Sequence, residues 1–581
     1  MLRTVLAAAS AVLICGSGPA LAAPFTLEDM LRIEQFGQVS LSPLETTVAF
    51  ERIGPTLGAG PYEYDALDLV LRSQILIAPS DGHTAPRPLL PEVEGKGHVI
   101  GAWSPDDRRL LIYRLRDRTF TAGIADTVTG EVHWLSGTPE SAMWGRAAQW
   151  RDGDDLVMIQ RADSDLPPML RQGFHVQDRM NQLWRSTREG LEPGRTLIGG
   201  GAFLGLNPKP ADSRLVLVSA NNGHQRTLAS GRFHDLEIAP GGGFAAAVRF
   251  SGDRPFDPDI PFLQGDFSER RELTLADLES GETWEPLPGQ DISPLLLAWS
   301  PSGDRLLVWA RQDGEAWSDG RLMQIDPKRK TATPTRLGGF KPARIETGLR
   351  TEVVSADWLG ETPILYAQNG ERRDWVAFSD AGPQVLTADL TSPSVSLVAV
   401  SARRLVVQSG AEAWSVDQSG HAERLGRAVR TRPSVTSALV SQGQRFSFNS
   451  PPRRDWTLTG DGEEMWRVDM ATGAMLGVKM KRSSRILAAA ERRVVSATRD
   501  ERNGLALALD GEPPMIQLNN RLSEIAFAPA EAVTHQASDG SPLVSWLYRP
   551  LKTGEHKPAL IVIPYPGEPA YRPTSPEDGL T

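Results

Sequence analysis

The residues that could carry chemistry form few recognisable patterns. The chain has nine histidines and one cysteine, and no H-x-H or H-E-x-x-H spacing, so it carries no zinc signature. It contains no G-x-x-x-x-G-K-[ST] phosphate loop and no G-x-S-x-G nucleophile elbow. We therefore expect no metal and no cofactor, and the sequence motifs do not assemble a Ser–His–Asp triad.

Two acidic segments could in principle bind a positive group. The pair Glu463-Glu464 stands in "GDGEEMWRVD", where it could hold a substrate amine or form a solvated hairpin, and the strand–turn context favours the hairpin. The loop "SGDRPFDPDIPFLQGDF" from Ser251 is rich in acids, but the order of its ligands matches no calcium loop. Neither segment predicts a defined site.

Composition indicates a packed globular protein. The chain has 581 residues, of which 40% are hydrophobic and 23% charged, which allows several domains or one large repeat array with another domain. The net charge of −10 argues against a broad footprint for nucleic acid or for anionic lipid. We therefore expect no nucleic-acid partner.

The first 22 residues are typical of a Sec-type signal peptide. Arg3 precedes an apolar run from Val5 to Cys15, and Ala20-Leu21-Ala22 fits a cleavage site. The alternative is a retained anchor, but the run is short for a membrane span. We expect a periplasmic or secreted protein with no membrane span after cleavage. Since Cys15 is the only cysteine, the mature chain holds no disulfide.

A strand–turn–strand signal recurs through the body of the chain. After a short predicted helix in "FTLEDMLRI", with a capping box from Thr26 to Asp29, come copies such as "LAWSPSGDRLLVWAR" from Leu297. A second hairpin signal alternates with the first, as in "IADTVTGEVHWL" from Ile124 and "LADLESGETWEPL" from Leu275. Each combines turn residues with an alternating apolar run.

Two hairpins per repeat give four strands, and the repeats lie roughly 40 to 60 residues apart, as in propeller blades. The sequence therefore predicts a mainly β fold with a seven- or eight-bladed β-propeller, and a β-sandwich array is the alternative. Four tryptophans occupy the same place in their repeats, just before the turn, which indicates packing between blades and not ligand binding. They are Trp103, Trp150, Trp299 and Trp358.

The C-terminal stretch "DGSPLVSWLYRPLKTGEHKPALIVIPYPG" from Asp539 resembles the start of the hydrolase domain in the prolyl oligopeptidase family of serine peptidases. In that family a β-propeller caps an α/β-hydrolase domain. The resemblance implies a signal peptide at 1–22, a propeller with a short N-terminal helix at 23–530, and the first strands of an incomplete, truncated α/β-hydrolase domain at 531–581.

The resemblance implies an exported serine peptidase that acts on peptides. One functional residue carries over: Tyr565 of "PYPG" occupies the place of a tyrosine that donates its hydroxyl to the oxyanion hole. The nucleophile, acid and base of the family are not present in the 581 residues, so we expect the chain to be inactive as it stands. The alternative is a non-catalytic periplasmic propeller that binds peptides or proteins.

A finer resemblance concerns the segment from Phe50 to Gly82. It is similar to the first-blade insertion of the lasso-peptide isopeptidases, which hydrolyse an isopeptide bond in threaded peptides. The loop "IPYPGEP" differs from the one expected in that branch. The resemblance therefore implies lasso-peptide isopeptide bonds as one candidate substrate.

Overall fold

The protein is described from a computed structural model. The described residues are 23–59, 64–91, 96–142, 144–191, 203, 205, 211–253, 269–343, 354–429, 439–440, 443–448, 455–460, 464–481, 484–499, 504–551 and 558–562. They form two compact units, one of residues 34–499 with 505–518 and the other of residues 1–33 with 500–504 and 519–581. Each unit is considered by itself below.

The larger unit begins with two four-stranded antiparallel sheets. Their inner strands β3 and β7 are largely buried and have an apolar centre, as expected for strands packed on both faces. The elements are β2 (Gln35–Leu41), β3 (Thr47–Ile53), η1 (Asp65–Arg72), β4 (Ser73–Pro79), β5 (Arg87–Pro88), β6 (His98–Trp103), β7 (Arg109–Arg116), β8 (Thr119–Asp126) and β9 (Val132–Trp134).

A seven-stranded sheet follows, and its strand β13 is shared between two halves. One part of β13, up to Gly231, pairs with β12, and the part from Arg232 onward pairs with β14. The helix α2 lies between β11 and β12 in the chain. The elements are β10 (Ala148–Trp150), β11 (Asp155–Arg161), α2 (Pro168–Arg188), β12 (Ser213–Ser219), β13 (Gln225–Ile238), β14 (Phe244–Asp253), β15 (Glu269–Asp277) and β16 (Thr283–Trp284).

Two five-stranded sheets come next. In each of them two short segments pair with the same long strand, β19 or β24. The elements are β17 (Asp291–Ile292), β18 (Ala298–Trp299), β19 (Leu306–Arg311), η4 (Trp317–Asp319), β20 (Arg321–Asp326), β21 (Thr331–Pro334), β22 (Lys341–Pro342), β23 (Ala356–Leu359), β24 (Thr362–Asn369), β25 (Arg372–Ser379) and β26 (Gly382–Val385).

The last two sheets of this unit have seven and four strands. The seven-stranded sheet again turns around a shared strand, β30, which pairs with β29 and, through Arg427 and Ala428, with β31. The elements are β27 (Pro393–Val400), β28 (Arg404–Ser409), β29 (Glu412–Asp417), β30 (Ala422–Ala428), α4 (Gln444–Phe448), β31 (Trp456–Gly460), β32 (Met465–Asp469), β33 (Met475–Val478), β34 (Arg485–Ala489), β35 (Val494–Arg499), β36 (Leu505–Leu509) and β37 (Ile516–Leu518).

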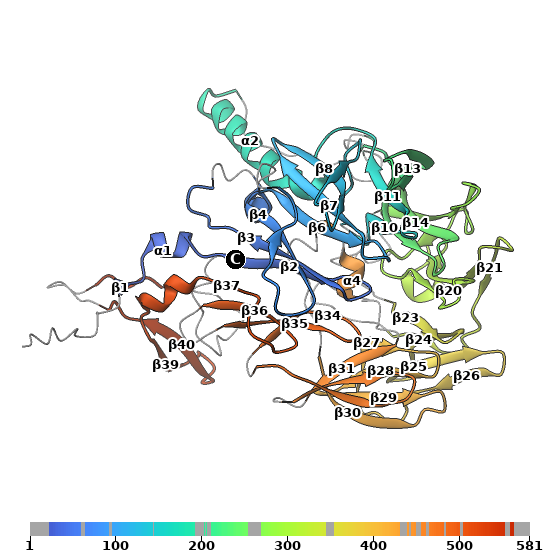
Figure 1. The fold of residues 1–581 in the computed structure, drawn as a ribbon. Helices are drawn as coiled ribbons and strands as arrows, with labels where there is room; N and C mark the ends of the chain where they lie inside the picture. Colours follow the sequence, from blue (N-terminus) through green and yellow to red (C-terminus); the bar gives the residue numbers. More distant parts are fainter. Residues whose placement is uncertain are drawn as a thin grey trace, which may run out of the picture. The chain divides into compact units, whose positions relative to one another are not determined.

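Apolar clusters join each sheet to the next and the last sheet to the first. Phe50 of β3 packs in one cluster with Val495 of β35 and Leu507 of β36, and the Glu45 carboxylate accepts the Arg492 backbone N–H at 2.9 Å. The sheets therefore close into a β-propeller (Figure 1). This confirms the prediction of a mainly β fold.

The described residues form seven sheets of four or more strands. The two seven-stranded sheets each contribute two packed layers, because β13 and β30 continue from one layer into the next. The repeat pattern did not predict these shared strands, although Ser230-Gly231 stands where β13 changes partner.

The second hairpin signal folds as its turn residues predict. Asp126 Oδ1 accepts the backbone N–H of Val128 at 2.9 Å and of Thr129 at 2.8 Å, and Gly130 has a φ of 75°. These hydrogen bonds lower the pKa of Asp126, the largest contribution coming from the Thr129 N–H. Equivalent turns begin at Asp277, Asp417 and Asp469.

The smaller unit contains the two ends of the described chain. Thr26 and Asp29 form the predicted capping box at the start of α1 (Leu27–Leu31). An ion pair also joins Asp29 to Arg521. The other elements are β1 (Ala23–Pro24), η5 (Asn520–Glu524), β38 (Ile525–Ala526), β39 (Ala530–Gln536) and β40 (Pro542–Tyr548), with β1 paired to β38 and β39 to β40.

Asp107 links the first two sheets, so a substitution of Asp107 tests how these sheets are held together. Its carboxylate accepts hydrogen bonds from the Ser42 hydroxyl at 2.6 Å, the Leu44 N–H at 2.9 Å and the Thr46 hydroxyl at 2.6 Å. The asparagine of D107N keeps the shape of the side chain and tolerates the backbone φ of 62°. Its amide NH₂ group, however, donates where a carboxylate oxygen accepted. We expect a loss of about 1–3 kcal/mol in the free energy of unfolding, measured by urea titration. The control D380N, at an exposed turn residue, should change it by less than about 0.5 kcal/mol.

Candidate functional site

The residues singled out from the sequence do not form a site among the described residues. Tyr565, Glu463 and most of the acidic loop after Ser251 lie outside them, and Glu464 is exposed. Within the described ranges no group of three or more His, Cys, Asp or Glu side chains is suited to hold a metal ion.

One Ser–His pair occurs on the hairpin of β39 and β40. His535 Nε2 and Ser545 Oγ lie 2.8 Å apart. Both side chains are exposed, so this hydrogen bond lies in water and not in a cavity that could bind a substrate. We do not assign chemistry to it.

The propeller instead contains a cavity of about 430 Å³, a volume typical of small-ligand and peptide sites. It is lined by segments from successive sheets, around Trp150, Ile238, Trp299 and Asp357, and by Arg445 of α4. Figure 1 shows α4 in the middle of the ring of sheets, far in sequence from the neighbouring β10 and β14.

The cavity wall follows the repeat of the sequence. Its residues Gln149, Glu237, Ala298 and Asp357 each stand directly before the tryptophan of a repeat, or before Ile238 where the repeat has no tryptophan. Because side chains alternate along a strand, this position faces away from the packed tryptophan. The position before the repeat tryptophan was therefore the signal that could have identified these residues from the sequence.

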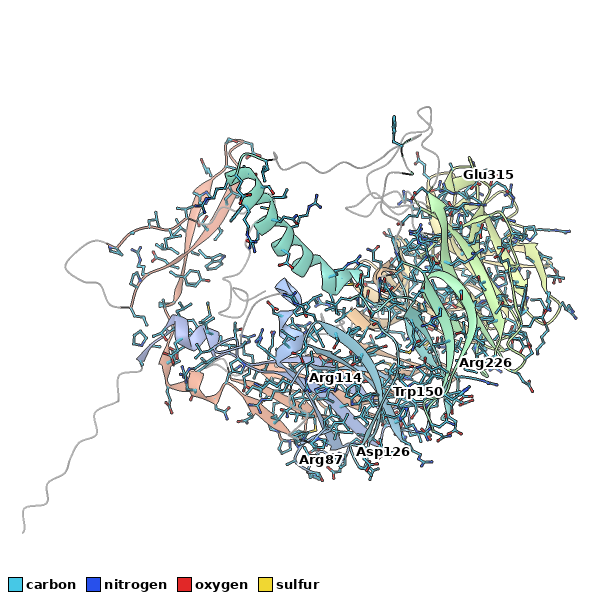
Figure 2. All side chains as sticks on the ribbon, turned by 90° about the horizontal axis from the view of Figure 1, so that it is seen from above. Arg87, Arg114, Asp126, Trp150, Arg226 and Glu315 are labelled. Carbon is cyan, nitrogen blue, oxygen red and sulfur yellow. The ribbon has the colours of Figure 1, made fainter. Side chains whose placement is uncertain are left out.

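The repeat tryptophans confirm the predicted packing role. All four are buried, with exposed fractions from 9% for Trp103 to 0% for Trp358, and Figure 2 places Trp150 inward of Arg87 and Asp126, which lie at the edge. Each indole N–H also donates to the preceding layer, which fixes the inner strands against one another. The hydrogen bonds are Trp103 to Ser40 Oγ (3.0 Å), Trp150 to the Ala102 carbonyl (2.8 Å), Trp299 to the Glu237 carbonyl (3.0 Å) and Trp358 to the Ala298 carbonyl (3.0 Å).

A buried ion-pair network forms one wall of the cavity. The guanidinium of Arg445 donates to Asp235 through Nε at 2.7 Å and through Nη2 at 3.0 Å, and to Glu237 Oε2 at 2.8 Å. Arg146 donates to the same oxygen of Glu237 at 3.2 Å. Arg445 and Asp235 are 3% and 0% exposed, so their charges are compensated mainly by each other.

The network sets the pKa values of its acids in opposite directions. Burial raises the pKa of Asp235, and Arg445 only partly offsets this effect. Burial also acts to raise the pKa of Glu237, but Arg146 and Arg445 outweigh it, so the pKa of Glu237 is lowered. Glu237 therefore presents a charged carboxylate at the cavity wall near neutral pH.

Behind this wall lies a neutral histidine. Neither ring nitrogen of His234 has a hydrogen-bond partner among the described residues, and its ring lies 4.2 Å from that of Phe250. Burial, together with the charges of Arg271 and Arg232, lowers the pKa of His234 well below its ordinary value. His234 therefore packs as an aromatic ring and does not act as an acid or base.

No family model and no curated protein matches the chain, but several solved structures are similar to it. Dipeptidyl peptidase 4 of Porphyromonas gingivalis is 11% identical, with 91% of this chain and 67% of that chain covered and a TM-score of 0.41. An acylaminoacyl peptidase in complex with Z-Gly-Gly-Phe-chloromethyl ketone is 10% identical, with 91% and 59% covered and a TM-score of 0.35. The AtxE2 isopeptidase with bound Astexin3-dC4 is 13% identical, with 92% and 61% covered and a TM-score of 0.27. This chain thus spans less than two thirds of the length of the last two proteins.

Proposed function

We propose that this chain belongs to an exported serine peptidase of the prolyl oligopeptidase type, and that its propeller admits a peptide into the central cavity. The observation that carries the proposal is the cavity itself. It has a volume suited to a few residues of an extended peptide, and its lining combines indole rings with the carboxylates of Glu237 and Asp357 and the guanidinium of Arg445. These are groups that can hold both the side chains and the main chain of a peptide.

Two features of the sequence support the peptidase assignment. The segment from Asp539 to Pro550 follows the propeller and resembles the start of the hydrolase domain in this family, and residues 1–22 resemble an export signal. In an enzyme of this type Tyr565 would donate its hydroxyl to the developing oxyanion. Lasso-peptide isopeptide bonds are the substrate that the resemblance of Phe50 to Gly82 favours.

The second candidate is a propeller that binds peptides without cleaving them. The observation that favours it is the position of the cavity, whose lining residues all belong to the propeller. Binding at this place therefore needs no residue of the smaller unit. Both candidates require peptide binding in the cavity, and release of cleaved products distinguishes the peptidase from the binding protein.

Filling the cavity should abolish this binding. Peptides retained from a casein digest by the immobilised chain would be identified by mass spectrometry and titrated by calorimetry. Because Ala298 lines the cavity, we expect A298W to weaken their binding by at least about tenfold, or ~1.4 kcal/mol. The control T331W adds the same ring to an exposed position on the outer strand β21 and should bind normally. Equal binding by A298W and T331W would contradict a peptide site in the cavity.

A further inference from the structure

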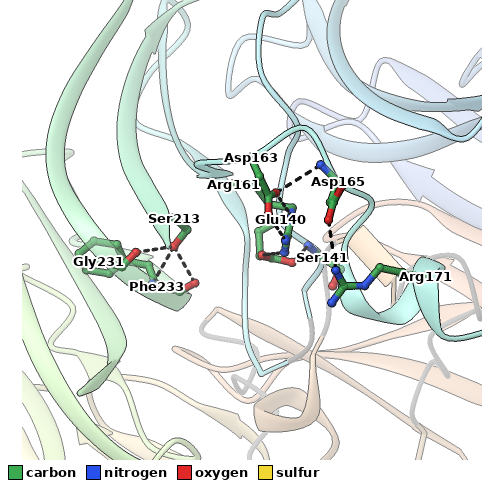
Figure 3. A network of polar contacts seen from close by, with 9 residues as sticks. All are labelled: Glu140, Ser141, Arg161, Asp163, Asp165, Arg171, Ser213, Gly231 and Phe233. Carbon is green, nitrogen blue, oxygen red and sulfur yellow. Dashed lines mark hydrogen bonds and ion pairs between the residues drawn. The ribbon is translucent and has the colours of Figure 1, made fainter. Parts of the chain in front are cut away.

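Side chains at the beginning of the helix α2 contact the propeller. Leu166, just before the helix, and Leu170 in its first turn are buried in the core that the second and third sheets share. Arg171 forms an ion pair with Asp165 at 3.4 Å, beside the buried pair of Arg161 and Glu140 at 3.1 Å (Figure 3). These contacts fix the direction in which the helix leaves the sheet.

The side chains of the second half of α2 are mostly exposed. From Asp178 to Arg188 every described side chain is exposed except the half-exposed Leu183 and Ser186, and Figure 1 shows the helix extending away from the sheets of its unit. The exposed fractions of Met180 and Trp184 are 40% and 67%. A helix that ends in water does not require large apolar side chains, so their presence needs a further explanation.

The apolar residues of this half share one face. Met180 and Trp184 are four positions apart, and Leu183 lies between them in the same turn, so all three project from one side. Leu191, just after the helix, is also exposed, at 69%. We call Met180, Leu183 and Trp184 the apolar row.

Arginines flank the apolar row. The second half of the helix carries Arg179, Arg185 and Arg188 against one acid, Asp178, whereas Arg171 is paired with Asp165. The whole chain has a net charge of −10. Arg185 and Arg188 are exposed, and the structure gives them no ion pair with any described residue. The helix is therefore a local basic element on an acidic protein, which the composition of the whole chain conceals.

We propose that the second half of α2 docks on an anionic lipid surface. A helix that combines an apolar face bearing tryptophan with arginines on its polar face lies in the interface of a bilayer, with the apolar side chains among the acyl chains and the cations at the headgroups. The described helices include none long and apolar enough to cross a membrane, so the contact is peripheral. A second copy of this chain fits less well, because pairing two such helices would bring like charges together.

The test measures binding of the full chain to vesicles of phosphatidylcholine with phosphatidylglycerol, and to vesicles of phosphatidylcholine alone, by co-sedimentation. All variants keep the same N-terminus, so differences between them report on α2. We expect R185E/R188E to weaken binding to the anionic vesicles by more than about tenfold, and W184S to weaken it by several fold without lowering the thermal unfolding temperature.

The matched control is R329E/R403E. It changes the net charge by the same amount at two exposed arginines outside α2, and it should bind the anionic vesicles as the unmodified chain does. Equal loss in both double variants would overturn the proposal in favour of a general charge effect. Equal binding to neutral vesicles, or a dimer in sedimentation velocity that W184S dissolves while vesicle binding persists, would overturn it as well. None of these results depends on the cavity, so they do not test the proposal that a peptide binds there.

Discussion

Replacing Arg445 by alanine is expected to lower the free energy of unfolding by about 3–5 kcal/mol. The guanidinium is 3% exposed and its partner Asp235 is 0% exposed, so R445A leaves a buried carboxylate without its main countercharge. Glu237 keeps Arg146 at 3.2 Å, which limits the loss to one pair. Unfolding by urea followed by circular dichroism measures the change.

A double-mutant cycle separates the contribution of the Asp235–Arg445 ion pair to stability from that of the packing of α4. Because D235L/R445M removes both charges, we expect it to be less destabilised than D235L or R445M alone. R185A truncates an exposed arginine of α2 and should change stability by less than about 0.5 kcal/mol. A loss of less than about 1 kcal/mol in R445A would show that water reaches Asp235 and that the network does not hold α4 in place.

The same variant also bears on peptide binding. Arg445 lines the cavity and holds Glu237 Oε2 at 2.8 Å, so its removal leaves the Glu237 carboxylate less constrained. If peptides bind at this wall, R445A at a temperature where it stays folded should bind them more weakly. Intact binding would place the peptide on the other walls, near Trp150 and Trp299.

The sequence was most informative where structure is local. The capping box of Thr26 and Asp29 and the turns after Asp126 and Asp277 depend on residues two to four positions apart, so their side chains carry the signal directly. The repeat tryptophans were identifiable for a related reason, because each repeat places the same residue at the same point of a strand.

The features that the sequence did not predict depend on contacts between distant segments. Arg445 meets Asp235 across 210 positions. It stands in "SALVSQGQRFSFNS", which the sequence indicates as a weak copy of the strand–turn–strand repeat, but the structure has the helix α4 there. The shared strands β13 and β30 were missed because the local mark at each change of partner is a single glycine, Gly231 or Gly426, and a glycine in a strand also fits an ordinary bulge. The cavity combines both features, since Glu237 lies on β13 and Arg445 on α4.

Net charge describes the whole chain and not its elements. The value of −10 argues against a broad anionic-lipid footprint, and it averages over the second half of α2, where three arginines accompany one aspartate. Salt screens such charges beyond about 8–10 Å, so the charges on α2 itself decide which charged groups the helix attracts. A count over each element, and not over the chain, would have identified the helix.

The second large effect is expected at Trp358, which tests whether the repeat tryptophans hold the layers together. Its side chain is 0% exposed, its indole N–H donates to the Ala298 carbonyl at 3.0 Å, and the guanidinium of Arg305 lies 4.8 Å from its ring centroid. W358A removes the ring and leaves a cavity between two layers. We expect a loss of about 3–5 kcal/mol in the free energy of unfolding, measured by urea titration with circular dichroism.

W358F separates the hydrogen bond from the packing. Phenylalanine fills most of the space but cannot donate, so the Ala298 carbonyl loses this donor and the loss should be about 1–3 kcal/mol. W184A removes the same side chain from an exposed position, 67% accessible, and should change stability by less than about 0.5 kcal/mol. If W358F cost as much as W358A, the indole N–H would carry most of the contact between the layers. If W358A cost no more than W184A, the tryptophans would have to serve another purpose than joining one layer to the next.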